Sequence, residues 1–508
     1  MKLRNIAYPI TIAIFATLVI PICVSAQEPP RIEPGSKTPH HRYQLVDVGT
    51  LGGPQSASYF GDAQSLNNRG AVVGQADTKT PDPNYPNFNP YIGFGGPDPF
   101  VLHAFEAQGG KLTDLGALPG ANSTSVGWIT ESGASAGVSQ DGSIDPLTGW
   151  PEAVAVYWKD GQIVNLGTLG GNESIATAIN DRGQIVGAAA NSIPDHLSSP
   201  LGVPSYGTQQ RAFLWENGAM HDLGTLGGPD AVALLMNERG QVAGISYTSS
   251  IPNTSGIPTI DSFLWDKDGM TDLGSFGGTV TAPNWLNKKG QVVGFSNLSG
   301  DTTAHPFLWS KVDGLKDLGT LGGTFGSANW VNEAREIVGA STIPGDQLQF
   351  AFLWKDAVMT NLGTVAGDAC SVAFHINSHR QIVGSSVSSD NCFGDSGHAF
   401  LWEDGGMIDL NIFIPPGVNL TLTQGAFIND RGEILATGVL PSGDFRTVLL
   451  IPCDPEHGDR EACEDERTGA GVMREAPTSR ISGATPRLPG RRPMSPFRFS
   501  RTVRRPGN

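Results

Sequence analysis

One phrase, repeated along most of the chain, constrains this sequence more than any other feature. Three motifs recur in a fixed order, a "DLGTLGG" turn, an "INDRGQIVG" segment and a "HAFLW" segment, and each occurs eight times. The copies of the first motif begin at Asp47, Asp114, Asn165, Asp222, Asp272, Asp317, Asn361 and Asp409. Because a catalytic residue is needed only once, repetition at this period indicates an array of structural units.

Each unit can be divided into four short strands. In the third unit these are "SIATAI" (174–179), "QIVGAA" (184–189), "RAFLW" (211–215) and "MHDLG" (220–224). Asn180 and Gly183 lie between the first two apolar runs, and Asn-x-x-Gly between such runs is typical of a hairpin. The sequence therefore predicts antiparallel four-stranded sheets.

The two ends of the array complement each other. It opens at 43–53 with "YQLVDVGTLGG", a last strand with no unit before it, and closes at 445–452 with "FRTVLLIP", a third strand with no fourth after it. Pairing the strand near Tyr43 with the strand near Val448 would satisfy both exposed edges. We therefore expect an all-β fold, an eight-bladed β-propeller closed by the N-terminal strand. A linear solenoid is the alternative, but it would need capping repeats.

The segments outside the array differ from it in composition. Residues 1–26 have a basic start at Lys2 and Arg4, an apolar run and a small-residue "VSA" end, which is typical of a secretory signal peptide. A membrane anchor is the alternative, although the run is short and Pro9 and Pro21 interrupt it. We expect a linker at 27–42, the array at 43–452, a disulfide-closed segment at 453–468 and a disordered Arg/Pro-rich tail at 469–508. The protein is expected to be secreted, extracellular or periplasmic, with no transmembrane segment after signal removal.

The cysteines fit an oxidising compartment. Four remain after signal removal, Cys370, Cys392, Cys453 and Cys463. An even number in an exported chain indicates two disulfides, and proximity favours Cys370–Cys392 and Cys453–Cys463 among the three pairings that four cysteines allow. A zinc site is less favoured, because no CxxC pair or histidine cluster accompanies them.

The charge distribution restricts the partners. The formal net charge is −16, although the tail is rich in Arg. An acidic body argues against nucleic acid as a partner. The tail itself is either a solvated segment or an electrostatic contact to an anionic envelope.

The motifs "HAFLW", "DLGTLGG" and "INDRGQIVG" resemble the extracellular HAF-repeat family of bacteria, over roughly residues 43–452. The resemblance implies a secreted or surface repeat protein and no known activity, substrate or catalytic residue. The second unit departs from the pattern with "ITESGASAG" and "AVAVYW", and the first with "HAFEA".

The repeated polar residues favour structural roles. The Asp of the "DLG" motif is replaced by Asn165 and Asn361, so what all eight units share is a hydrogen-bond acceptor and not a charge. The first position of "HAFLW" is His in only some units, which argues against a metal set. The sequence therefore nominates no catalytic residue, metal or cofactor.

The long loops between second and third strands of the first four units are the candidate binding surface. If the units form a propeller, these loops lie on one face, which is often where ligands bind. Aromatic residues beside polar groups suit a glycan or peptide. The candidate binding residues are Tyr85, Phe88, Tyr91, Phe94, Trp150, Tyr206 and Tyr247. The alternative for the first loop is that it folds onto its own blade.

Two functions are compatible with these features. The first is a non-enzymatic secreted protein that presents this loop face to a protein or glycan partner. The alternative is a propeller enzyme, a hydrolase or lyase acting on envelope or extracellular polysaccharide through carboxylates such as Asp141, Asp145 or Asp195. Fold alone does not choose between them.

Overall fold

The computed structural model describes residues 42–58, 63–93, 96–120, 123–197, 200, 207–253, 256–389, 392 and 397–453. The chain divides into two units, Met1–His41 and Arg42–Asn508, and all the described residues lie in the second. The expected signal peptide and the segment after Cys453 lie outside the described residues. Among the residues that are described, no helix has the length and apolar character needed to cross a bilayer.

The fold is all-β, as expected, and consists mainly of four-stranded antiparallel sheets in chain order. The first complete sheet holds β2 (Gly52–Ala57), β3 (Val72–Pro81), β4 (Phe100–Gln108) and β5 (Lys111–Gly116). The second holds β6 (Thr124–Ile129), β7 (Ser135–Ile144), β8 (Pro151–Lys159) and β9 (Gln162–Gly167). The third holds β10 (Gly170–Ile179), β11 (Ile185–Pro194), β12 (Thr208–Glu216) and β13 (Ala219–Asp222).

The next two groups of four strands are joined into one eight-stranded sheet by a parallel bridge between Ile260 and Val280. They are β14 (Ala231–Met236), β15 (Val242–Tyr247), β16 (Ile260–Asp266) and β17 (Gly269–Asp272), then β18 (Gly277–Leu286), β19 (Val292–Leu298), β20 (Ala304–Ser310) and β21 (Gly314–Asp317). Two further sheets follow, β22 (Gly326–Val331), β23 (Ile337–Thr342), β24 (Gln349–Lys355) and β25 (Val358–Asn361), then β26 (Cys370–Ile376), β27 (Ile382–Val387), β28 (Gly397–Glu403) and β29 (Gly406–Asp409). A short 3-10 helix, η1 (Leu410–Phe413), follows β29.

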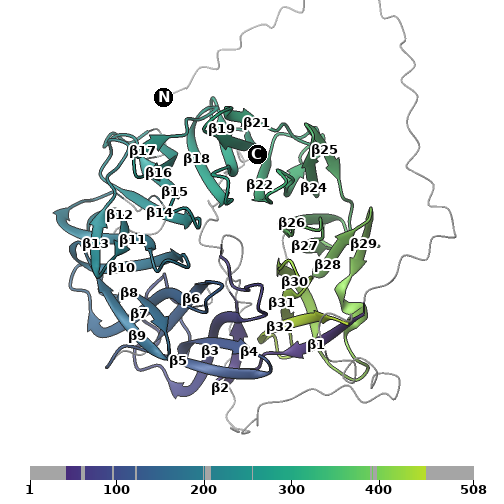
Figure 1. Cartoon of the computed structure of the whole chain (residues 1–508), viewed down its shortest axis with the longest axis horizontal. Coiled ribbons are helices and arrows are strands. Elements are labelled where there is room, and N and C mark those ends of the chain that lie inside the picture. Colours follow the sequence, from purple (N-terminus) through teal and green to yellow (C-terminus); the bar gives the residue numbers. More distant parts are fainter. Residues whose placement is uncertain are drawn as a thin grey trace, which may run out of the picture. The chain divides into compact units, whose positions relative to one another are not determined.

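The last sheet is built from both ends of the described chain. Its order is β1 (Tyr43–Asp47), β32 (Phe445–Pro452), β31 (Ile434–Val439) and β30 (Thr421–Ile428). The antiparallel register places Tyr43 opposite Pro452 and Asp47 opposite Val448, which confirms the predicted pairing of the two end strands. In Figure 1, β1 in purple lies beside β32 in yellow-green, and successive sheets lie side by side.

The glycine of the "IVG" motif explains why the core repeats so regularly. In the third sheet Gly187 lies opposite Phe213, and a Cβ atom on Gly187 would overlap the carbonyl oxygen of Ile175. The missing side chain leaves room for the phenylalanine of "HAFLW". That phenylalanine is fully buried in six repeat units, at Phe105, Phe213, Phe263, Phe307, Phe352 and Phe400.

The asparagine of "INDRG" both shapes its own turn and links neighbouring sheets. In the turn after β26, Asn377 Oδ1 accepts hydrogen bonds from the backbone N–H groups of His379 and Gln381. Its Nδ2 donates to the carbonyl oxygen of Asn429 in the next sheet. Among the described residues the same sheet-to-sheet bond is donated by Asn67, Asn237, Asn287, Asn332, Asn377 and Asn429. The bond from Asn429 reaches Asn67, so it connects the last sheet to the first.

The first residue of the "DLG" motif acts as a hydrogen-bond acceptor, as its replacement by Asn in two units suggested. Asp222 Oδ1 accepts the N–H of Gly224 at 2.8 Å, and Asn165 Oδ1 accepts the N–H of Gly167 at 2.7 Å. Gly224 has a φ of 87°, a left-handed conformation that favours glycine. The acceptor oxygen fixes the turn between sheets, and the charge of Asp is not required for it.

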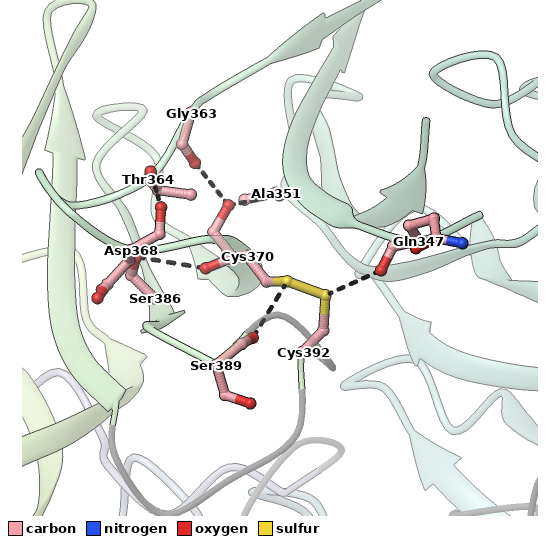
Figure 2. Close-up of a disulfide and its surroundings, with 10 residues drawn as sticks. Gln347, Ala351, Gly363, Thr364, Asp368, Cys370, Ser386, Ser389 and Cys392 are labelled. Carbon is pink, nitrogen blue, oxygen red and sulfur yellow. Dashed lines mark hydrogen bonds between the residues drawn. A yellow bond between two sulfur atoms is a disulfide. The ribbon is translucent and has the colours of Figure 1, made fainter. Parts of the chain in front are cut away.

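One predicted disulfide is present and links β26 to a residue that follows β27. Cys370, at the start of β26, is bonded to Cys392, with their Cα atoms 5.3 Å apart. Figure 2 shows the bond between the carbonyl groups of Ser389 and Gln347, and Gln347 comes from the preceding sheet. Cys453 is also disulfide-bonded, while Cys463, its expected partner, lies outside the described residues.

First strands of different sheets also meet through aromatic side chains. Trp285 stacks on Trp330 with ring centroids 3.3 Å apart, and Trp330 contacts His375 at 3.7 Å. His375 also contacts Phe427 at 3.9 Å and is buried, and neither ring nitrogen has a hydrogen-bond partner among the described residues. Burial therefore lowers the pKa of His375 well below its ordinary value.

The lowered pKa of His375 predicts that the protein loses stability as the pH falls. The folded state holds His375 neutral, whereas the unfolded chain binds a proton below pH about 6.5. The free energy of unfolding should therefore fall by about 1.4 kcal/mol per pH unit below that value, relative to a His375→Phe variant. Urea unfolding at pH 7 and pH 5 measures the difference. His379→Gln, at an exposed position nearby, is the control, and parallel pH profiles for wild type and His375→Phe would contradict the prediction.

Candidate active site

The predicted aromatic binding residues do not form one exposed group. Tyr85 is 42% exposed, while Phe88, Tyr91 and Trp150 are half-buried. Tyr247 is fully buried in β15, so its ring lies in the core and not on the loop face. Phe94 and Tyr206 lie outside the described residues.

The long loop between β3 and β4 lies against the neighbouring sheets. Asn87 Nδ2 donates to the carbonyl of Gly149 at 2.8 Å, and Asn89 Nδ2 donates to the carbonyl of Pro151 at 3.0 Å. Asn89 Nδ2 also lies 3.1 Å from Oε2 of Glu173. The loop therefore reaches across the second sheet to the start of the third, where it contacts a carboxyl group.

Glu173 is the most unusual ionisable residue at this contact. It lies in β10, is fully buried, and its Oε2 also accepts the backbone N–H of Ala153 in β8 at 3.1 Å. Its Oε1 has no hydrogen-bond partner among the described residues. Burial, with smaller contributions from nearby Asp145 and Glu152, raises the pKa of Glu173 to about 9. Glu173 is therefore a protonated acid at neutral pH.

The fold does not need a carboxyl group at this position. At four of the described junctions the residue before the "HAFLW" segment has a backbone N–H that is satisfied by the next sheet, and the acceptor varies. It is Ser123 Oγ for Leu102, and the carbonyl of Thr324 for Ala304. Only Glu173 and Asp230 use a carboxylate among the described junctions, and the equivalent places in β18 and before β22 hold Val280 and Phe325.

Asp145 lies directly after β7 and faces the same region. Its Oδ1 accepts the N–H of Leu147 at 2.8 Å and Nδ2 of Asn172 at 3.1 Å, and its Oδ2 accepts the hydroxyl of Thr148 at 3.2 Å. Asp145 is 1% exposed. Its three donors come from its own loop and from β10, so Asp145 is an oriented carboxylate at the junction of two sheets.

A cavity brings the two acids together. It has a volume of about 190 Å³, and its walls include Asp145, Leu147, Asn172 and Glu173. Two more carboxyl groups, those of Asp141 and Glu152, lie nearby. Burial and then the charges of Asp141 and Asp145 raise the pKa of Glu152. None of the described residues that line the cavity is Lys, Arg or His.

The predicted carboxylates thus separate into two places. Asp145 lines the cavity and Asp141 lies near it, whereas Asp195, which directly follows β11 as Asp145 follows β7, hydrogen-bonds to Asp230. Burial raises the pKa of Asp230 to about 8, and Asp195 adds to the shift. Sequence reasoning missed Glu173 and Asp230. The available signal was an acid two residues after the double glycine, where other units carry Val280 or Phe325.

Histidine pairs account for the other polar feature of the repeat. His103 bonds to Asp114 and His305 bonds to Asp317 within their own sheets. His398 instead bonds at 2.8 Å to Asp368, beside a second cavity of about 620 Å³. No group of three His, Cys, Asp or Glu residues in the described part of the chain is arranged to hold a metal ion.

Comparisons with known proteins give likeness of fold only. No protein-family model matches the chain, and no curated protein sequence matches it. Among solved structures, the β-propeller domain of the trilobed protease from Pyrococcus furiosus is 10% identical, covers 53% of this chain and 81% of its own, and has a TM-score of 0.34. Dipeptidyl peptidase 4 of Porphyromonas gingivalis is 9% identical over 82% of this chain and 61% of its own, with a TM-score of 0.41. Trypanosoma rangeli sialidase is 11% identical over 84% and 60%, with a TM-score of 0.28. This chain therefore spans about three fifths of the length of the latter two.

These comparisons contradict the expectation of a non-enzymatic protein. The similar propeller-like structures belong to a protease, a peptidase and a sialidase, which agrees better with the enzyme alternative. At TM-scores below 0.5 they assign no reaction to this chain, so the choice of site and chemistry depends on its own residues.

The pKa of Glu173 leads to a prediction about stability. The folded state keeps the proton up to pH about 9, whereas the unfolded chain loses it near pH 4.5, so stability falls as pH rises between these values. Relative to Glu173→Gln, the wild-type free energy of unfolding should therefore fall by several kcal/mol between pH 5 and pH 9. Chemical unfolding at both pH values tests this. Asp404→Asn, an exposed carboxylate, is the control, and an equal pH dependence in wild type and Glu173→Gln would refute the prediction.

Proposed function

We propose that the chain is a secreted enzyme of the HAF-repeat type that cleaves extracellular or envelope polysaccharide at the cavity between the loop after β7 and strands β10 and β11. The observation that carries this proposal is the pairing of a protonated buried acid, Glu173, with an oriented carboxylate, Asp145, in one cavity wall. Cleavage of a glycosidic bond needs these two forms, one carboxyl to donate a proton and one to act as base or nucleophile.

The fold that we propose around this site is an eight-bladed propeller closed by the N-terminal strand. Two observations support closure, the pairing of β1 with β32 and the hydrogen bond from Asn429 to Asn67. In such a closed array the loops after β3, β7 and β11 share one face. Export is supported by the basic and apolar N-terminal sequence and by the disulfide between Cys370 and Cys392.

In the proposed reaction, Glu173 donates its proton to the glycosidic oxygen as the bond to the sugar carbon breaks. Asp145 removes a proton from the attacking water, or attacks the sugar carbon itself, as its separation from Glu173 dictates. Asn172 and Thr148 hold Asp145 in place, and Asn89 and the N–H of Ala153 hold Glu173. A lyase reaction would use the same two groups as base and acid.

Release of new reducing ends from a panel of extracellular polysaccharides tests this function. Glu173→Gln should lower kcat at least about 100-fold, because it removes the transferable proton, and Asp145→Asn should have a similar effect. Asp230→Asn is the matched control, because Asp230 makes the same sheet-to-sheet bond as Glu173 outside this cavity. Cleavage by the Glu173→Gln variant at the wild-type rate, or no cleavage of any polysaccharide by the wild type, would reject the proposal.

A further inference from the structure

The cavity beside Glu173 combines several carboxyl groups with no cationic side chain among the described residues of its wall. Asp145 and Glu173 form part of its wall, Asp141 and Glu152 lie within electrostatic reach, and no Lys, Arg or His is among the described residues that line it. Buried charges are ordinarily paired. Here Glu173 avoids an unpaired charge by keeping its proton.

The contacts of the two Glu173 carboxyl oxygens indicate how a bound cation could replace the proton on Glu173. Glu173 Oε2 is occupied by Asn89 and the N–H of Ala153, whereas Oε1 is buried without a described partner. A cation bound in the cavity would provide the opposite charge that the ionised carboxylate lacks. Asp230 differs, because the neighbouring Asp195 hydrogen-bonds to it.

We propose that this cavity binds a small protonated primary amine, whose ammonium group pairs with Asp145 and takes the place of the Glu173 proton. The proton leaves to solvent, so one positive charge enters as another departs. Amines of this class include the ammonium-bearing end of an amino sugar. The site is that of the proposed polysaccharide cleavage, but amine binding does not require that any bond is cleaved.

Amine binding has a consequence for chemistry in the same cavity. An ionised Glu173 has no proton to donate, so a bound amine would inhibit acid-assisted cleavage. The exchange of a proton for an ammonium group also makes binding dependent on pH. Affinity should rise by about tenfold per pH unit between pH 6 and 8, because each binding event releases one proton from Glu173.

Isothermal titration calorimetry with ethanolamine tests the inference, with ethylene glycol as a neutral ligand of the same size. At pH 7.5 ethanolamine is protonated, and titrations in phosphate and in MOPS, which lack a primary amine, report the number of protons released. We expect the wild type to bind ethanolamine at least tenfold more tightly than ethylene glycol, with release of about one proton.

The variants decide whether Glu173 is the source of the proton. Glu173→Gln should release no proton and lose the pH dependence, whereas Asp230→Asn should behave as wild type. Equal affinity for the two ligands, no proton release from the wild type, or the same release from Glu173→Gln would overturn the inference. Because calorimetry measures binding, a protein that binds amine but cleaves no polysaccharide would refute only the proposed function.

Discussion

The pairing of β1 with β32 is the interaction on which the rest of the structure depends. Five consecutive residue pairs join strands that are about 400 residues apart in sequence, and further bonds extend the junction from the N–H of Val48 to Thr447 and from the N–H of Cys453 to Arg42. Without it, β32 would present an open edge and the final sheet would have three strands. A long unpaired edge favours association with other chains, so the pairing also protects the protein from aggregation.

Much of the fold could be predicted because the same three motifs recur eight times in the sequence. Repetition averages out local ambiguity, and the surplus strand at Tyr43 sets the phase of the array, which its pairing with the strand at Val448 confirms. The link from Asn377 to Asn429 could not be predicted in the same way, because a turn asparagine looks identical whether or not its Nδ2 reaches the next sheet. The repeated motif therefore indicated the turn but not the hydrogen bond to the next sheet.

The candidate site was predicted only in part, for a physical reason. Asp145 was recognised because it lies in a long loop, but Glu173 lies within a strand, and its surroundings include Asn89, a residue 84 positions away. Burial and the absence of a nearby cation are properties of the assembled junction and leave no local pattern. For the aromatic residues the prediction was wrong in one case, since Tyr247 was expected on the binding surface and is buried in the core.

The two acids also show how a repeat fold acquires a special site. Where Ala304 bonds to a backbone carbonyl, Ala153 bonds to the carboxyl of Glu173, so the architecture is kept while a buried acid is introduced. Keeping that acid buried costs stability at neutral pH, and stability costs of this kind are typical of functional positions.

Hydrogen exchange followed by mass spectrometry on the protein tests the pairing of the two ends most directly. The account predicts that peptides covering 43–48 and 445–452 are protected to the same degree as those covering an interior strand such as β15, and that truncation before residue 49 exposes 445–452. Rapid exchange across 43–48 in the intact protein, with 445–452 unaffected by the truncation, would contradict it.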